Sequence, residues 1–318
     1  MARATPAQKP APDPRRAHYG RFYGLDPIPD DRPLLLVHGN CQAESLRIML
    51  GAADVDTLRI PPVHELTAAD VPHLRALLPR VAILVTQPVH PGYHDLPLGT
   101  EELIAQLPPD ARVARVPVIR YSGLHPLLGI VRSPGDRSLV PPVVAYTDLR
   151  TLCEAAGQRV DPGFSPTPSA VREVAAASLA ELTTREQSGC DVVASDLFET
   201  PHFGLMRTIN HPGNPVFTTV AARVRAFLGL GALVVDPGRE LLSSVIAPRE
   251  AAVVEAFGLG GGSGDPDWPA SADWSVDGER VGADVVRSEH LDWFRRNPDT
   301  VGAGLERHSD TLRMLGLG

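Results

Sequence analysis

From residue 34 to residue 119 the chain alternates between apolar runs and stretches with helical periodicity. Strands are predicted where short runs rich in apolar residues are bounded by turn residues, at residues 34–37, 55–60, 81–85 and 112–119. Helices are predicted between these runs, at residues 42–50, 67–78 and 100–107. The run at 81–85 is apolar throughout, as expected of a central strand in a parallel sheet. Because strands that alternate with helices build βαβ units, we expect an α/β fold with a doubly wound, mainly parallel sheet.

The rest of the chain is predicted to be mainly helical. Helices are expected at residues 147–156, 167–187, 217–228 and 288–317, the last of them broken near Pro298. Residues 190–198 predict one more helix or a short strand, and another short strand is expected before a Pro/Gly turn at 210–215. Residues 234–257 predict a short strand and helical pieces.

These elements suggest three parts along the chain. Residues 1–30 form an N-terminal arm, which is disordered to about residue 17 and then carries aromatic residues expected to dock on the body. Residues 31–258 form the α/β catalytic domain, for which we expect a three-layer core. Residues 259–318 add a Gly-rich linker (258–264) and a C-terminal helical segment that packs on the core.

Composition and charge narrow the class of protein. The chain has 318 residues, of which 43% are hydrophobic and 21% charged, as in ordinary globular proteins. Its net charge is −8 and no Lys/Arg run exceeds two residues, which argues against a nucleic-acid groove or a polybasic membrane patch. No apolar stretch approaches the roughly 18 residues that span a bilayer, and residues 1–16 lack the apolar core of a secretory signal. We therefore expect a cytoplasmic protein without stable membrane insertion; a homo-oligomer is left open.

The cysteine and histidine spacings do not predict a metal site. The three cysteines, Cys41, Cys153 and Cys190, are too few and too scattered for a disulfide framework or a paired zinc site. His90 and His94 lie four residues apart, but the Pro-Gly pair between them disfavours the helix that would bring them together. We expect no metal.

A candidate nucleophile follows the first predicted strand. Residues 34–37 lead through His38 into a Gly39-Asn40-Cys41-Gln42 turn, and the next helix ends at Gly51. The N-terminus of a helix offers backbone N–H groups and a positive dipole end, which lower the pKa of a cysteine thiol. A buried cysteine that only packs is the alternative.

Other polar segments follow the carboxyl ends of neighbouring predicted strands. Gln87 comes after the strand at 81–85, and Arg120-Tyr121-Ser122-Gly123 comes after the strand at 112–119. Ligands of doubly wound sheets bind at the carboxyl ends of the strands, so we expect these residues and Cys41 to meet in one crevice.

Nucleophilic catalysis also requires a base and an oxyanion hole. Among the eleven histidines, His211 is preferred because it lies in a loop at the end of an element, with Asp196 upstream as a candidate orienting group. Asn40, Gln42 and Gln87 are candidate oxyanion or positioning residues.

Several motifs together resemble the WcbI family. They are Val37-His38-Gly39-Asn40-Cys41-Gln42-Ala43-Glu44, Thr86-Gln87-Pro88, Tyr121-Ser122-Gly123-Leu124-His125-Pro126 and Asn210-His211-Pro212. The resemblance covers roughly residues 18–260 and implies a polysaccharide-biosynthesis protein that binds coenzyme A and acts as an acetyltransferase. The family is also similar to SGNH hydrolases, which implies that Cys41 takes the serine position and His211 the base position. Those hydrolases place an Asp three residues before the His, where this chain has Thr208, so a Cys–His dyad is the expectation.

The resemblance implies acyl transfer from coenzyme A, or another thioester, to a hydroxyl of a sugar or small metabolite. Candidate coenzyme A ligands are Gly39, Arg120, Tyr121, Ser122 and Arg207, because arginine grips phosphate in two-pronged fashion. One alternative is a thioesterase or esterase with the same dyad and water as the acceptor. Another is a non-catalytic protein that binds coenzyme A or a glycan.

Overall fold

The computed structural model describes residues 13–136, 138–259 and 270–317. These residues divide into two compact units. The first unit contains the described residues up to Val116 together with Val224–Val235, and the second contains Pro117–Arg223 and the described residues from Asp236 onward. A unit boundary thus falls within the range 31–258 that the sequence assigns to one domain. Of the expected Gly-rich linker, residues 260–264 lie outside the described residues.

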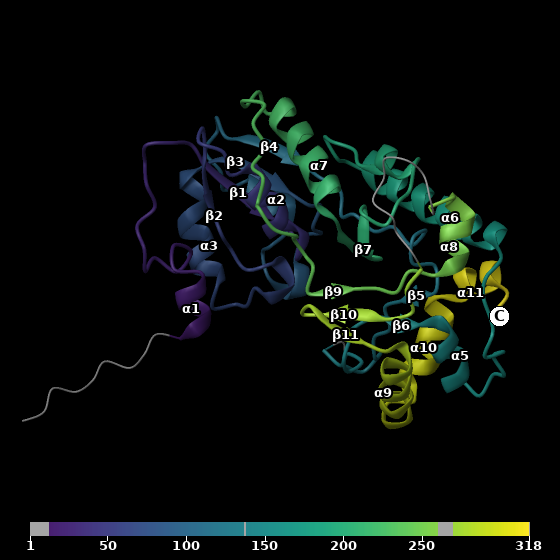
Figure 1. Cartoon of the computed structure of the whole chain (residues 1–318). Helices are drawn as coiled ribbons and strands as arrows, with labels where there is room; N and C mark the ends of the chain where they lie inside the picture. The colour runs from purple at the N-terminus through teal and green to yellow at the C-terminus, as the bar shows by residue number, and fades with distance from the viewer. Residues whose placement is uncertain (1–12, 137, 260–269, 318) are drawn as a thin grey trace, which may run out of the picture. The chain divides into compact units, whose positions relative to one another are not determined.

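Four parallel strands form the sheet of the first unit (Figure 1). Their bounds are Leu34–His38 (β1), Asp56–Leu58 (β2), Val81–Thr86 (β3) and Arg112–Arg115 (β4). The order across the sheet is β2-β1-β3-β4, and the two central strands pair from Leu35 with Ile83 to His38 with Thr86. The chain moves from β1 to one side and then returns past β1 to the other side, which makes the sheet doubly wound, with its switch point between β1 and β3.

Helices connect these strands in the order that the hydrophobic pattern predicts. The connecting helices are α2 (Gln42–Leu50), α3 (Val71–Leu77) and α4 (Thr100–Ile104), with short 3-10 turns η1 (Val63–Glu65), η2 (Leu78–Arg80) and η3 (Tyr93–Asp95). Leu36 of β1, Leu74 of α3 and Leu84 of β3 lie in one buried cluster, so the apolar face of the crossover packs on the sheet. The strand predicted to reach residue 119 ends at Arg115 because Pro117 cannot donate to the ladder.

The N-terminal arm docks on the first unit earlier than expected. Helix α1 (Pro14–His18) begins at a proline after Asp13, whose carboxylate accepts the backbone N–H of Arg15. Arg15 and Tyr23 both donate to Asp70, at 3.1 and 2.7 Å. The prediction of a disordered tail to about residue 17 is therefore wrong for residues 14–17, because the cap and the ion pair order them.

The second unit combines helices with short strand pairs (Figure 1). Its strands are β5 (Leu128–Gly129), β6 (Thr147–Asp148), β7 (Met206–Thr208), β8 (His211–Pro212), β9 (Val245–Ile246), β10 (Trp274–Val276) and β11 (Glu279–Val281). Its helices are α5 (Leu149–Ala155), α6 (Pro168–Gln187), η4 (Ser195–Phe198), α8 (Ala251–Phe257), α9 (Ala283–Arg296), α10 (Asp299–Arg307) and α11 (Ser309–Leu315). Helix α7 (Asn214–Phe227) begins in this unit, and its last four residues belong to the first.

The second unit contains a hairpin that is not among the predicted elements. Strands β10 and β11 pair around Asp277-Gly278, whose φ angles of +49° and +86° are those of a two-residue hairpin turn. Strand β9 extends the hairpin to three strands. An Asp-Gly pair is a strong local signal for such a turn, so this element could have been predicted.

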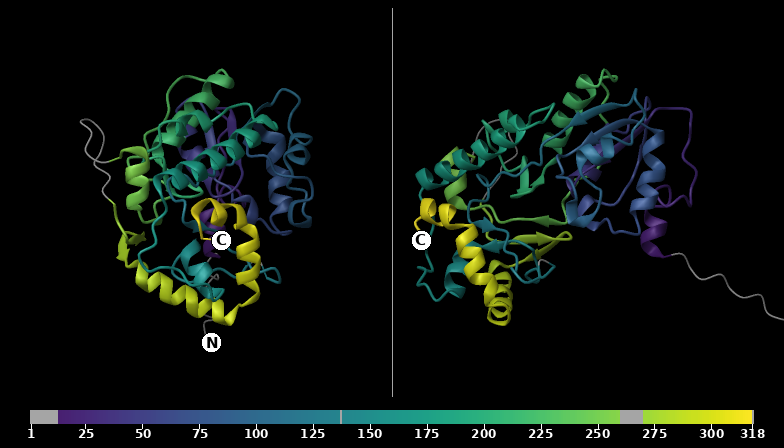
Figure 2. Two further views of the ribbon diagram at one scale, coloured as in Figure 1. Left: turned by 90° about the vertical axis from the view of Figure 1, so that its right-hand side faces the viewer. Right: turned by 180° about the vertical axis from the view of Figure 1, so that it is seen from behind.

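The C-terminal helices pack on other helices of the second unit. The break falls at Asn297-Pro298, between α9 and α10, and α11 packs against α6 (Figure 2). Trp293, Phe294 and Leu312 share one buried cluster with Leu152 of α5. The α/β class, with a doubly wound parallel sheet and an added C-terminal helical region, is confirmed. Within the described residues, no helix is long and apolar enough to cross a membrane.

Candidate active site

Cys41 lies at the switch point of the parallel sheet. Strand β1 ends at His38, and Cys41 is the last residue before α2. Its backbone is already helical (φ −55°, ψ −22°) and its side chain does not cap the helix. The half-buried thiol therefore stands at the positive end of a nine-residue helix. The lowered thiol pKa expected from this position stays a prediction.

Gln87 ties the end of β3 to the cysteine turn. Its Oε1 accepts the backbone N–H of Asn40 at 2.8 Å, and its Nε2 donates to Gln42 Oε1 at 3.0 Å. Asn40 Oδ1 in turn accepts the N–H of Gln42 at 2.9 Å. A Cβ on Gly39 would lie 2.4 Å from Gln87 Oε1, so only glycine lets the two segments approach this closely. The structure thus brings Asn40, Gln42 and Gln87 together.

The hydrogen bonds within the cysteine turn leave one side-chain donor, the Asn40 amide, for a ligand. The backbone N–H groups of Asn40 and Gln42 are used to hold the turn. The side-chain NH2 of Asn40 donates no hydrogen bond within the part of the chain that the structure describes. Asn40 is therefore the strongest candidate for an oxyanion donor among the predicted residues, whereas Gln87 holds the turn.

His211 lies in a tight hairpin of the second unit. Strands β7 and β8 pair antiparallel, with Thr208 opposite His211. Burial, with a smaller contribution from the positive charge of Arg207, lowers the pKa of His211 to about 4. The imidazole is therefore neutral near pH 7, as a proton acceptor must be.

Tyr146 orients the His211 ring. The Tyr146 hydroxyl donates to Asn210 Oδ1 at 2.7 Å and lies 3.3 Å from His211 Nε2. Because the hydroxyl proton goes to Asn210, we assign a proton to Nε2, which donates to the Tyr146 oxygen. The lone pair is then on His211 Nδ1, which is buried and has no hydrogen-bond partner among the described residues. No local motif indicated Tyr146, which lies 65 residues away in the sequence.

Asp196 does not orient His211 as the sequence analysis expected. Both of its carboxylate oxygens accept from Arg223, at 2.6 Å each, and this pairing lowers the Asp196 pKa. Thr208, three residues before His211, is buried and donates to Asn210 Oδ1 at 3.2 Å. The side chain at the position of the missing aspartate thus contacts Asn210, which also accepts from Tyr146.

The candidate coenzyme A ligands of the second unit differ in how far their side chains are exposed and free to contact a ligand. Tyr121 is 1% exposed and stacks on Phe198, so it cannot reach a ligand from this position. Ser122 is half-buried, and its backbone N–H donates to Ser178 Oγ at 2.9 Å. Arg207 donates to the carbonyl of Leu241 and pairs with Glu240.

Arg120 is exposed and keeps its side chain available for an anion, so it is the best of the predicted arginines. Cys41, Asn40 and Gln87 belong to the first unit, and His211 belongs to the second. The Cys41–His211 pair therefore stays a prediction. No group of three His, Cys, Asp or Glu residues that could hold a metal ion occurs within residues 13–136, 138–259 and 270–317.

The fold and the cysteine turn place the chain among α/β proteins with a doubly wound sheet. In this chain a cysteine lies at the start of the helix that follows the first strand, beside the switch point of the sheet. A family model described as polysaccharide biosynthesis enzyme WcbI matches residues 34–233, more than half of the chain. The chain belongs to the WcbI family, which is a family of polysaccharide biosynthesis enzymes.

A solved structure of WcbI shares the fold. It is similar over 90% of this chain and 97% of the other, with a TM-score of 0.74 and 21% sequence identity. It is described as a novel polysaccharide biosynthesis enzyme, in its native form without a disulfide bond between coenzyme A and one of that protein's cysteines. No curated protein matches the chain.

Proposed function

We propose that the protein is an acyltransferase that moves an acyl group from coenzyme A, or another thioester, to a hydroxyl of a saccharide or small metabolite. The observation that carries the proposal is the position of Cys41 at the start of α2, held by Gln87 at the switch point of the sheet. The family supplies the context of polysaccharide biosynthesis. The description of the WcbI relative names coenzyme A together with a cysteine, which supports the same cosubstrate here.

Cys41 would act as the nucleophile. Its thiolate, stabilised by the N-terminus of α2, attacks the thioester carbonyl, and the thiolate of coenzyme A leaves as a covalent acyl-cysteine forms. The Asn40 side-chain NH2 would donate to the oxyanion of the tetrahedral intermediate, because it is the donor that the turn does not use.

His211 would move the proton of the second step. Its neutral ring presents the lone pair of Nδ1, because Tyr146 engages Nε2. Nδ1 accepts the proton of the acceptor hydroxyl as that oxygen attacks the acyl-cysteine, and Cys41 departs as the thiolate. Tyr146 and Asn210 would keep the ring in the tautomer that this step needs.

Binding of coenzyme A would use the carboxyl ends of the parallel strands. Doubly wound sheets bind ligands at the switch point, which here lies beside the cysteine turn. Arg120 is the candidate for a phosphate group, since Arg207 is already paired with Glu240.

Steady-state assays with acetyl-coenzyme A test the proposal. We expect release of coenzyme A to require a hydroxyl acceptor and to fall at least about 10³-fold in Cys41→Ala and about 10²- to 10⁴-fold in His211→Gln. Cys190→Ala is the matched control, because Cys190 is also half-buried and should leave turnover unchanged.

Three outcomes would contradict the proposal. Full turnover in both Cys41→Ala and His211→Gln removes the dyad. Release of free acetate at the same rate with and without an acceptor assigns the enzyme to the hydrolases. Tight binding of coenzyme A without turnover of any acyl thioester assigns a binding role.

A further inference from the structure

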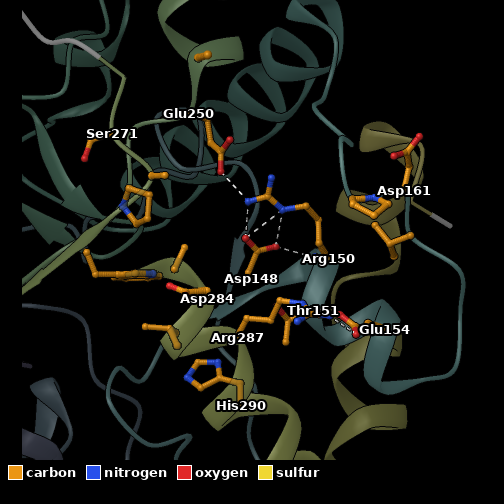
Figure 3. A pocket seen from close by; sticks show the side chains of 18 of the residues that line it. Asp148, Arg150, Thr151, Glu154, Asp161, Glu250, Ser271, Asp284, Arg287 and His290 are labelled. Atoms are coloured by element: carbon orange, nitrogen blue, oxygen red, sulfur yellow. Dashed lines mark hydrogen bonds and ion pairs between the residues drawn. The ribbon is translucent and has the colours of Figure 1, made fainter. Parts of the chain in front are cut away.

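A cavity of about 930 Å³ lies within the second unit (Figure 3). Its walls are the start of α5 with residues 158–162, the start of α8, residues 270–274 and the first half of α9. This volume is within the range of ligand-binding cavities, and neither Cys41 nor His211 lines the cavity. The proposed chemistry therefore leaves this cavity without a role.

Two arginines of this cavity are paired with neighbouring carboxylates. Arg150 lies between Asp148 and Glu250 and donates to them at 2.6 and 2.8 Å (Figure 3). Arg287, an exposed residue of the lining, pairs with Glu154. Five carboxylates and four arginines line the cavity in all. A polyanion such as a nucleotide would therefore meet no excess of positive charge.

The same groups leave hydrogen-bonding capacity for an uncharged ligand. Glu250 Oε1 accepts from Arg150, whereas Oε2 accepts no hydrogen bond from any described residue. Burial raises the pKa of this carboxyl, although Arg150 opposes the shift. Ser271 places a hydroxyl in the lining, and Trp274 and Val286 give apolar wall. The lining therefore combines paired charges, a free carboxylate acceptor and an apolar surface. This combination suits a ligand such as a sugar, whose ring carries hydroxyl groups and also has an apolar face.

The cavity is connected to His211 through two aromatic rings. Trp274 stacks on Tyr146 with ring centroids 6.3 Å apart and planes 16° apart. The hydroxyl of Tyr146 lies 3.3 Å from His211 Nε2. Tyr146 directly precedes β6 (Thr147–Asp148), so one short segment places the Tyr146 side chain at the histidine and the Asp148 side chain in the cavity wall.

We propose that this cavity binds an uncharged saccharide, held by the carboxylate of Glu250 and by Arg150, which Asp148 holds in place. Its use as the acceptor site rests on the proposed acyltransferase function, whereas saccharide binding itself does not. The saccharide hydroxyls donate to Glu250 Oε2 and accept from the Arg150 guanidinium, and the carbon face of the ring packs on the apolar wall.

A glycan array of neutral, amino-bearing and uronic acid-containing oligosaccharides tests the proposal, followed by saturation-transfer NMR with the strongest neutral oligosaccharide. We expect neutral oligosaccharides to bind the wild-type full chain, and binding to fall at least 10-fold in Glu250→Gln and in Ala251→Trp. The tryptophan would fill the cavity from an exposed position at the start of α8. Glu255→Gln is the matched control, because Glu255 is exposed on the same helix and does not line the cavity.

Unchanged binding in Ala251→Trp, binding of uronic acid-containing oligosaccharides alone, or no binding to the wild type would each overturn the proposal. The acyl adduct on Cys41 is measured on the same variants. If the adduct forms but no saccharide binds, only the proposal of a saccharide site is refuted. If a saccharide binds but no adduct forms, only the proposed acyltransferase function is refuted.

Discussion

At the scale of the residue, Tyr146 decides which nitrogen of His211 can accept a proton. The hydroxyl gives its hydrogen to Asn210 and accepts from Nε2, so the lone pair remains on Nδ1. Burial keeps the ring neutral, since the pKa of His211 lies near 4. A single phenol oxygen thus sets both the tautomer and the orientation of the candidate base.

Tyr146→Phe removes that oxygen and keeps the packing of the ring on Trp274. We expect kcat for acetyl transfer to fall about 10- to 100-fold with little change in KM for acetyl-coenzyme A, because only proton transfer is impaired. Long-range ¹H–¹⁵N NMR of the His211 ring is expected to show the proton on Nε2 in the wild type and a mixture of tautomers in the variant.

Tyr121→Phe is the control for this substitution, because Tyr121 is also buried and its ring stacks on Phe198 rather than on His211. It should leave both kcat and the tautomer unchanged. Full turnover in Tyr146→Phe, or a wild-type proton on Nδ1, would refute the role assigned to Tyr146.

At the scale of the element, the cysteine turn is a close contact between two strand ends. Gln87, from the end of β3, fills the space that a side chain at position 39 would need. The three hydrogen bonds among Asn40, Gln42 and Gln87 then fix how Cys41 enters α2. The geometry of the turn should therefore change if a single methyl group is added at position 39.

Gly39→Ala is expected to destabilise the protein by about 1–3 kcal/mol, because its Cβ forces Gln87 out of place. The rate of Cys41 alkylation by iodoacetamide should fall as the turn shifts. Gly302→Ala is the opposite control: its Cβ meets nothing within 4 Å in the exposed face of α10, so we expect a gain of up to about 1 kcal/mol. Urea denaturation measures both values, and equal effects from the two substitutions would contradict the packing argument.

At the scale of the whole molecule, buried neutral histidines couple stability to pH. Burial lowers the pKa values of His38 and His125 to about 4, as it does for His211. His38 lies within β1, and His125 lies between the carbonyls of Met206 and Pro248. All three therefore take up a proton far more readily in the unfolded chain than in the folded one.

The folded-state pKa is depressed below the unfolded value of 6.5, so the contribution to stability is complete above pH 6.5 and is lost as the pH falls towards 4. We expect the free energy of unfolding to decrease on the order of 1 kcal/mol per pH unit for each histidine in this window. Urea denaturation between pH 7 and 5 measures the slope. His38→Gln should reduce this slope, whereas His18→Gln, at an exposed position, should not. A free energy of unfolding that does not change with pH in the wild type would contradict the burial of neutral histidines.

Local signals made the strand, turn and helix around Cys41 predictable. An apolar run, a glycine and a helical period follow one another there within 20 residues. The Asp-Gly pair at 277–278 is an equally local signal, and it indicates the β10–β11 hairpin. The hydrogen-bond partners of His211 and Asp196 could not be predicted from local sequence, because Tyr146 and Arg223 lie 65 and 27 residues away from them. Only tertiary packing decides which residue meets which.

Intact-mass spectrometry after rapid mixing with acetyl-coenzyme A tests the central claim most directly. We expect one acetyl group on the wild-type chain, located by peptide mapping on Cys41, that disappears when a hydroxyl acceptor is added. Cys41→Ala should carry no adduct, and Cys190→Ala should carry the same adduct as the wild type. Turnover without any adduct on Cys41, or an adduct that persists in Cys41→Ala, would contradict the account.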